Sequence, residues 1–80
     1  MHEMHLVSDL FCDLLQKGEE VGARKITKVY IRMGAFTELN PETLRYFFRE
    51  NGKETILAEA KFKIESSLTR EFRLLSFDYI

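Results

Sequence analysis

The spacing of the apolar residues switches between a helical and a strand-like period along the chain, and this order limits the folds it can adopt. From Leu6 to about Val21 apolar residues recur at intervals of three and four, which predicts one amphipathic helix. We expect Gly22 to end it, because glycine is common where helices stop. From Arg24 to Met33 apolar and polar residues alternate, which predicts a strand with one buried face.

The strand predicted over 24–33 has one face suited to a core. Because successive side chains of a strand point to opposite faces, residues of equal parity lie together. The core-facing set is Thr27, Val29, Ile31 and Met33. The opposite, largely hydrated set is Ile26, Lys28, Tyr30 and Arg32.

A second helix is predicted after Gly34, which ends the strand. Asn40-Pro41-Glu42 supplies an N-cap side chain, a proline at the first helical position and an acid near the positive end of the helix dipole. Asn51-Gly52 should close this helix. Its buried stripe is Leu44, Phe47 and Phe48, and the connection before it should be held to the domain by Phe36 and Leu39.

Two further strands are predicted in the last third of the chain. Ala60 to Glu65 alternates cleanly, and Ser66 to Thr69 has the composition of a turn. The run from Arg70 to Ile80 changes parity, because Phe72 and Leu74 fall on one face and Phe77 and Tyr79 on the other. A regular strand cannot bury both pairs, so we expect a β-bulge near Leu75–Ser76.

These elements predict an α+β fold in two layers, with the order helix, strand, helix, strand, strand. A three-stranded mixed sheet with both helices on one face buries every apolar stripe in a single domain, 1–80. The other sheet face should be hydrated. With Leu75 and Ile80 exposed as well, that face or the last strand's edge could bind a second chain. The residues expected on this open face are Tyr30, Arg32, Lys61, Lys63 and Glu65.

Composition excludes several classes of function. Lys and Arg number 12 against 13 Asp and Glu, so no net positive field favours nucleic acid as a partner. No apolar run approaches the length of about 20 residues that a membrane span needs, and the first residues do not resemble a signal peptide. We therefore expect a cytoplasmic protein without a membrane partner.

Cysteine and glycine usage gives no indication of an enzyme. Cys12 is the single cysteine, so the chain forms no internal disulfide and no thiolate zinc site. Its place in an apolar helix predicts a buried or half-buried packing residue. The chain has no credible nucleophile–base set, no paired catalytic carboxylates and no glycine-rich phosphate loop.

The first five residues, Met1-His2-Glu3-Met4-His5, gather nitrogen donors at the start of the first predicted helix. A terminal amine and imidazoles suit nickel, copper or zinc, and deprotonated backbone amides add nitrogens in square-planar geometry. The alternative is an ordinary start methionine followed by hydrated histidines. The His-Glu-x-x-His pattern of zinc proteases is absent, which argues against hydrolytic zinc chemistry.

Several of these segments, in this order, resemble the HypA/HybF nickel-maturation proteins. Met1-His2-Glu3 opens a helix, 25–29 enters a strand that ends at Gly34, and 41–48 forms the second helix. The segments 55–57 and 60–65 continue the likeness, and the tail 70–79 is similar to that family's last strand.

The resemblance implies a nickel carrier for [NiFe]-hydrogenase, and sometimes urease, maturation. Its implied partners are a nickel-maturation GTPase and the precursor of the hydrogenase large subunit. The implied Ni(II) ligands are the amine of Met1, the imidazole and backbone amide of His2, and the backbone amide of Glu3. The Glu3 side chain would support the site or dock a partner. If the first turn is helical, His5 shares a face with His2 and either joins the chelate or is a bystander.

The chain departs from the family where that family inserts a zinc domain with two cysteine pairs. Only Ser66 to Thr69 stands there, so no structural zinc is expected. Either the domain was removed by design or this is a natural shortened relative. The alternative function is that of a truncated or degenerate relative that acts as a dimerising interaction module without nickel delivery.

Overall fold

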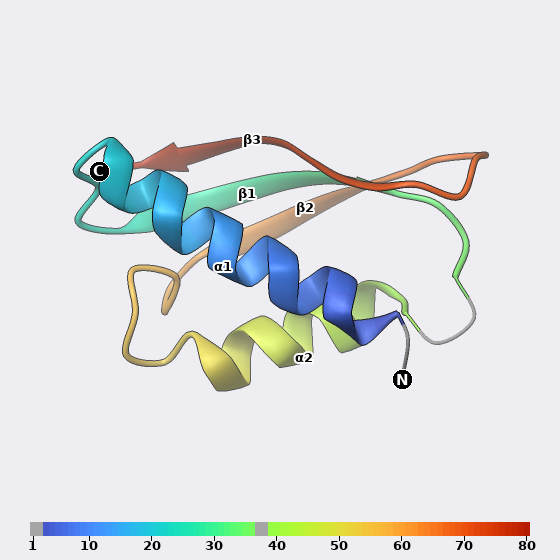
Figure 1. Cartoon of the computed structure of the whole chain (residues 1–80), viewed down its shortest axis with the longest axis horizontal. Helices are drawn as coiled ribbons and strands as arrows, with labels where there is room; N and C mark the ends of the chain where they lie inside the picture. The colour runs from blue at the N-terminus through green and yellow to red at the C-terminus, as the bar shows by residue number, and fades with distance from the viewer. Residues whose placement is uncertain (1–2, 37–38) are drawn as a thin grey trace.

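The computed structural model describes residues 3–36 and 39–80, and within them two helices lie on one side of a three-stranded sheet (Figure 1). This confirms the α+β fold and the element order predicted from the apolar periods. The elements are α1 (Met4–Glu20), β1 (Ile26–Met33), α2 (Pro41–Asn51), β2 (Lys61–Ser66) and β3 (Phe72–Tyr79).

β1 is the central strand of the sheet, whose order is β2-β1-β3. β2 pairs with β1 in parallel and β3 pairs with it antiparallel, so the sheet is mixed as expected. Val29 stands opposite Phe62 on one side and Phe77 on the other, which aligns apolar residues of the three strands in one row. β2 and β3 are therefore both edge strands.

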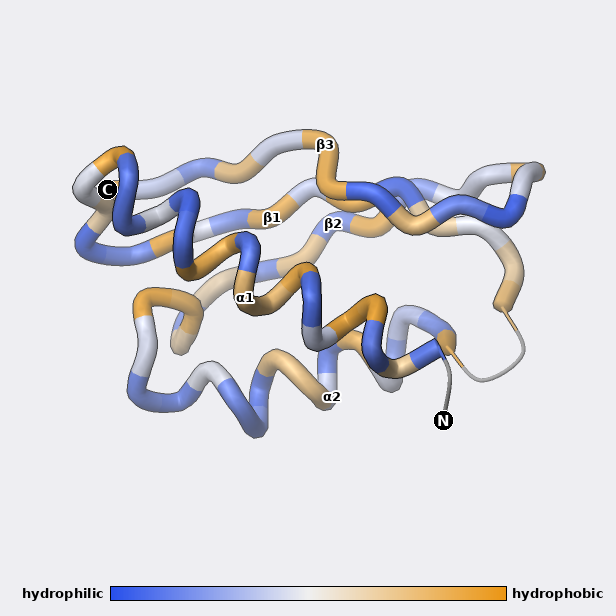
Figure 2. Tube along the Cα trace, viewed as in Figure 1, coloured by the Kyte–Doolittle hydropathy of each residue, from blue (hydrophilic) through white to orange (hydrophobic). Residues whose placement is uncertain are grey.

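α1 buries a single stripe and begins slightly earlier than the sequence predicted, at Met4 rather than Leu6. Hydrophobic and hydrophilic residues alternate around it in Figure 2. Gly22 ends it with φ of 70°, a left-handed conformation that glycine adopts without steric cost. The buried residues of α1 are Val7, Leu10, Leu14 and Gly18.

The expectation that Cys12 is a packing residue is wrong, because Cys12 is exposed. It lies two positions after buried Leu10 and two before buried Leu14. Two residues rotate an α-helix by about 200°, so a residue midway between two core positions points away from the core.

The predicted face assignment of β1 is wrong at its start. Ile26 is fully buried and Thr27 is exposed, the reverse of the expectation from parity. The pairing with β3 shifts register between Ile26 and Lys28, and a shift of one residue moves a side chain to the other face. From Val29 to Met33 the predicted faces are correct.

The predicted β-bulge in β3 is confirmed. Tyr30 pairs with Ser76 while Ile31 pairs with Leu74, so Leu75 is the extra residue. The bulge turns Leu75 outward, where it is 41% exposed, and lets both Leu74 and Phe77 pack against the core. Phe72, Leu74 and Phe77 are half-buried, whereas Tyr79 stays exposed.

The two layers are joined by an apolar core and a cluster of phenylalanines. Phe11 of α1 meets Phe48 of α2 at 5.5 Å between ring centroids, and Phe48 meets Phe62 of β2 at 4.4 Å. Leu39 is buried and Phe36 packs beside the core, as predicted for the connection before α2. The buried apolar residues are Val7, Leu10, Leu14, Ile26, Val29, Ile31, Met33, Leu39, Leu44, Phe48 and Leu57.

α2 begins with the predicted cap, which we expect to carry measurable stability. Asn40 Oδ1 accepts from the Thr43 backbone N–H at 2.9 Å, and Thr43 Oγ1 accepts from the Asn40 N–H at 3.0 Å. Asn40→Ala should lower the free energy of unfolding by about 1 kcal/mol, because the backbone N–H of Thr43 loses its partner. Chemical denaturation measures the loss. Glu50→Gln, in the last turn of α2, is the control, and an equal loss there would contradict a role for the cap.

The sheet face opposite the helices is polar, as predicted, with Lys61, Lys63 and Glu65 exposed and Tyr30 and Arg32 half-buried. Arg32 Nε contacts Glu65 Oε2 at 2.5 Å and the Tyr30 hydroxyl donates to Asp78 Oδ2 at 3.1 Å. In residues 3–36 and 39–80, neither helix has the length and apolar character to cross a membrane.

Candidate metal centre

Glu3 and His5, two of the predicted nickel-binding residues, lie at the amino-terminal end of α1. Met1 and His2 lie outside the described residues, so the structure begins at Glu3. Glu3 is the N-cap of α1, with φ of −80° and ψ of −22°, and its carbonyl accepts from the Leu6 N–H at 3.1 Å. The chain therefore enters the helix directly after the residue whose backbone amide is an expected ligand.

The Glu3 side chain is buried, with only 9% of its surface exposed, and is held by an ion pair. Arg70 Nη2 donates to Glu3 Oε2 at 3.0 Å from just before β3, 67 residues away in sequence. The Arg70 guanidinium lies 5.2 Å from the centroid of the Phe36 ring, a cation–π arrangement. Such burial favours a supporting role for this carboxylate over the docking role that the sequence left open.

His5 lies in the first turn of α1 and is exposed. It borders a shallow cavity of about 390 Å³ together with Glu3, Phe36 and Arg70. His5 and Glu3 thus border one pocket. The shared face of His5 and His2 cannot be compared, because His2 lies outside the described residues.

The described donors do not form a metal site by themselves. In the part of the chain that the structure describes, no three His, Cys, Asp or Glu side chains are grouped to hold an ion. The Glu3 carboxylate is engaged by Arg70, which leaves His5 as the available imidazole in this pocket. A complete site at this end of α1 would need the nitrogens of Met1 and His2.

Sequence reasoning missed the contribution of Arg70. The sequence indicates only that Arg70 begins the last run, 70–80, whereas the structure sets it against Glu3 and Phe36. No local pattern joins residues so far apart in the chain. The one available signal is that Glu3 precedes an apolar helix, where a buried carboxylate needs a cation.

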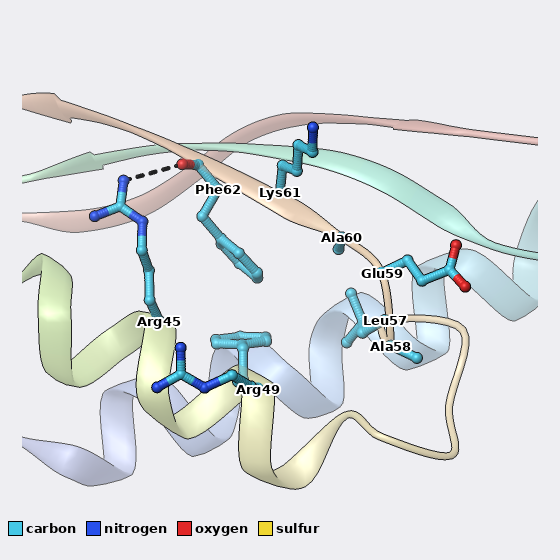
Figure 3. Close-up of a pocket in the computed structure, with 9 residues that line it drawn as sticks. Arg45, Arg49, Leu57, Ala58, Glu59, Ala60, Lys61 and Phe62 are labelled. Carbon is cyan, nitrogen blue, oxygen red and sulfur yellow. Dashed lines mark hydrogen bonds between the residues drawn. The ribbon is translucent and has the colours of Figure 1, made fainter.

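A second concave region lies between α2 and β2 and differs in chemistry (Figure 3). This cavity, of about 410 Å³, has Arg45 and Arg49 on one wall and Phe62 on another. Arg45 Nη2 donates to the Phe62 carbonyl at 3.1 Å. The one carboxylate on its rim, Glu59, accepts from Lys25 Nζ at 3.1 Å. Its cationic wall does not suit a metal ion.

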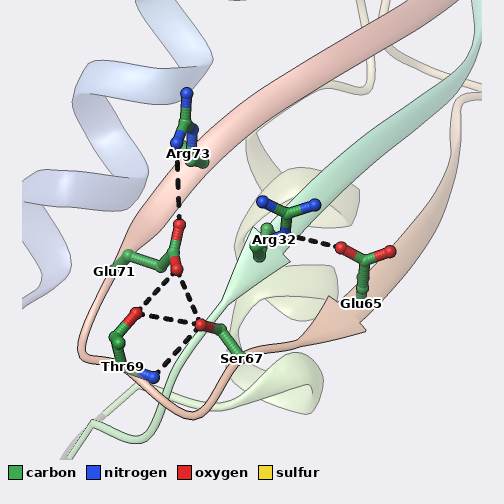
Figure 4. Close-up of polar contacts among 6 residues, drawn as sticks. All are labelled: Arg32, Glu65, Ser67, Thr69, Glu71 and Arg73. Atoms are coloured by element: carbon green, nitrogen blue, oxygen red, sulfur yellow. Dashed lines mark hydrogen bonds and ion pairs between the residues drawn. The ribbon is translucent and has the colours of Figure 1, made fainter.

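The turn between β2 and β3, which carries Arg70, is closely hydrogen-bonded (Figure 4). The hydroxyls of Ser67 and Thr69 each donate to Glu71 Oε2 at 2.7 Å. These two hydrogen bonds, with the nearby charges of Arg32 and Arg73, hold the pKa of the Glu71 carboxyl below its ordinary value of 4.5. A carboxyl group whose pKa is lower in the folded state stabilises the fold at every pH above its unfolded-state pKa. This stabilisation is therefore present at neutral pH and is lost as the pH falls through the folded-state pKa.

Comparison with known proteins identifies relatives over most of the chain. A family model described as "Hydrogenase/urease nickel incorporation, metallochaperone, hypA" matches residues 1–71. The hydrogenase maturation factor HypA of Methanopyrus kandleri is 35% identical over 65 residues, which cover 81% of this chain and 46% of that protein. HypA of Archaeoglobus fulgidus is 36% identical over 64 residues, which cover 80% of this chain and 58% of that protein. The chain spans about half the length of these curated relatives.

The fold also matches a solved structure. The solution structure of the Ni metallochaperone HypA from Helicobacter pylori aligns with a TM-score of 0.76 over 95% of each chain. At 15% identity this likeness concerns the fold alone. The family resemblance noted in the sequence is confirmed by the family model and by the curated relatives together.

Proposed function

Because the chain belongs to the HypA family of hydrogenase and urease nickel-incorporation metallochaperones, we propose that it binds Ni(II) at its amino terminus and hands the ion to a maturing [NiFe]-hydrogenase. The observation that carries this proposal is the anchoring of Glu3 at the start of α1. Met1 and His2 directly precede this anchored residue in the sequence, so we expect their donor atoms to lie close to it.

The proposed ligands are the amine of Met1, the imidazole and amide of His2, and the amide of Glu3, in a chain whose first residue is Met1. Four nitrogens from consecutive residues suit the square-planar geometry that Ni(II) accepts. His5 is proposed as an auxiliary donor, since it is exposed in the first helical turn beside Glu3. Its removal should therefore cost less affinity than removal of His2.

A site at the chain terminus suits a carrier better than a catalyst. An ion that is to be passed on needs few ligands and open access, because ligand exchange then proceeds without opening a core. The proposed binding releases protons, because an amine, with an ordinary pKa of about 8, and an imidazole, with one of about 6.5, must be deprotonated to bind a metal. Nickel affinity should thus fall as the pH drops through this range.

The proposed partners are a nickel-maturation GTPase and the hydrogenase large-subunit precursor, in the cytoplasm. The proposed domain organisation is a nickel domain in which the turn at 66–69 stands where relatives insert a zinc domain. In support, β2 and β3 are joined by residues 67–71 alone and the family match ends at residue 71. No structural zinc is part of this proposal.

Nickel titration of the untagged chain tests the proposal. We expect one Ni(II) per chain, bound in the micromolar range, by isothermal calorimetry at neutral pH. His2→Ala should weaken binding at least about tenfold, because it removes one ligand while the amine remains. His5→Ala is the matched control and should lower the nickel affinity less than His2→Ala does. Equal heats for the native chain and His2→Ala would refute the proposed ligand set.

A dimerising interaction module is the second candidate, and the β3 edge favours it. Leu75 and Tyr79 of this edge strand are 41% and 47% exposed, and Ile80, directly after it, is 60% exposed. Edge strands with exposed apolar residues pair readily with other chains. Light scattering separates the candidates: a nickel-independent dimer that takes up no nickel supports the module, whereas a nickel-binding monomer supports the carrier.

A further inference from the structure

We propose that Arg70 is a positioning residue for the nickel site, which holds the Glu3 carboxylate from the β2–β3 turn and so fixes the amino-terminal ligands at the head of α1. This inference rests on the proposed function. Arg70 would touch neither the ion nor a ligand atom, since its guanidinium contacts the Glu3 carboxylate and the Phe36 ring.

The two partners of the Glu3–Arg70 ion pair differ in exposure. The Glu3 side chain is 9% exposed, whereas the Arg70 side chain is 67% exposed. A buried carboxylate that loses its cation is strongly destabilised, whereas an exposed guanidinium is readily hydrated. The pair therefore serves to keep Glu3 in place, and loss of Arg70 should release the residue that joins the proposed ligands to α1.

The turn that carries Arg70 is itself held in place. The turn is joined to the end of β1 by two backbone hydrogen bonds, from Gly34 N–H to the Glu71 carbonyl at 2.8 Å and from Ser67 N–H to the Met33 carbonyl at 3.1 Å. Ser67, Thr69 and the Glu71 carboxylate close the turn from within (Figure 4). The Phe36 ring then supports the guanidinium at 5.2 Å.

A Glu3 that is held in place should raise the affinity for the metal. Chain termini fray unless they are tied down, and a frayed terminus must be ordered each time an ion binds. A terminus whose third residue is already held has less freedom to lose, so it binds more tightly with the same ligands. Arg70 would thus raise nickel affinity by preorganisation rather than by contact.

The test compares nickel binding by the native chain, Arg70→Gln and Arg49→Gln, all untagged. Arg49 is the matched control, because its guanidinium also lies over an aromatic ring, at 5.6 Å from the Tyr46 centroid, but on α2. We expect Arg70→Gln to weaken binding about tenfold, as loss of a group that orients metal ligands commonly does. Arg49→Gln should bind as the native chain does, and Arg70→Lys, which keeps the charge, should restore part of the affinity.

A metal-free measurement separates this inference from the proposed function. Amide hydrogen exchange of Leu6, whose N–H donates to Glu3, should accelerate in Arg70→Gln while the Val29 amide in β1 stays protected. If the native chain binds nickel and Arg70→Gln binds equally well, the inference fails and the carrier role stands. If the native chain takes up no nickel, the carrier role fails, and with it the effect of Arg70 on the metal. Unchanged exchange at Leu6 would refute the anchoring itself.

Discussion

One glycine added before Met1 should weaken nickel binding by about a hundredfold, the largest change in affinity that we expect from any single alteration of this chain. The added residue moves the free amine away from the proposed ligand set and places the imidazole on the third residue. The fused chelate rings formed by consecutive nitrogens can then no longer close in the same way. Isothermal calorimetry with the untagged and extended chains measures the difference at one pH.

The control for this extension is one glycine added after Ile80. That end lies at the far end of α1 from Glu3, where the Ile80 N–H donates to the Lys25 carbonyl at 3.0 Å (Figure 1). We expect its nickel affinity to equal that of the native chain. Equal affinity of the amino-terminally extended chain would instead show that the amine is not a ligand and that the imidazoles bind the ion with other groups.

The fold was predictable because its signals are local and periodic. Three predicted features follow from residues close in sequence, and the structure has all of them. They are the spacing of apolar residues in α1, the start of α2 at Asn40-Pro41 and the change of parity in β3. The bulge at Leu75 was predictable because a regular strand cannot bury both Leu74 and Phe77 on one face, and a bulge is the simplest way to do so. Local patterns of this kind are independent of which strand lies next to which.

The errors share a different cause. Ile26 and Thr27 lie on the faces opposite to those predicted because of a register shift against β3, a strand at the other end of the chain. The pairing of Glu3 with Arg70 likewise joins opposite ends of the chain. Ligand types at residues 1–5 could be read from the sequence, but the support of that site comes from the tertiary fold and leaves no periodic signal.

Gly34→Ala should be the most destabilising of the substitutions considered, with a loss of about 2 kcal/mol or more in the free energy of unfolding. A Cβ at this position would overlap the Thr69 carbonyl oxygen and would lie 2.8 Å from its carbon. Both atoms belong to backbone, so the clash cannot be relieved by a rotating side chain. The turn must move away from the end of β1, which also breaks the hydrogen bond between Gly34 and Glu71.

Because the same turn carries Arg70, Gly34→Ala should lower stability and nickel affinity together. Thermal unfolding should show a melting temperature lower by about 10 °C, given that 1 kcal/mol shifts a domain of this size by about 4–8 °C. Gly22→Ala is the matched control: its φ of 70° makes alanine strained, yet a Cβ there meets nothing within 4 Å. It should therefore cost about 1–2 kcal/mol without affecting nickel affinity. If Gly34→Ala loses stability but binds nickel as Gly22→Ala does, the turn supports the fold alone, and Glu3 must be held in place by other contacts.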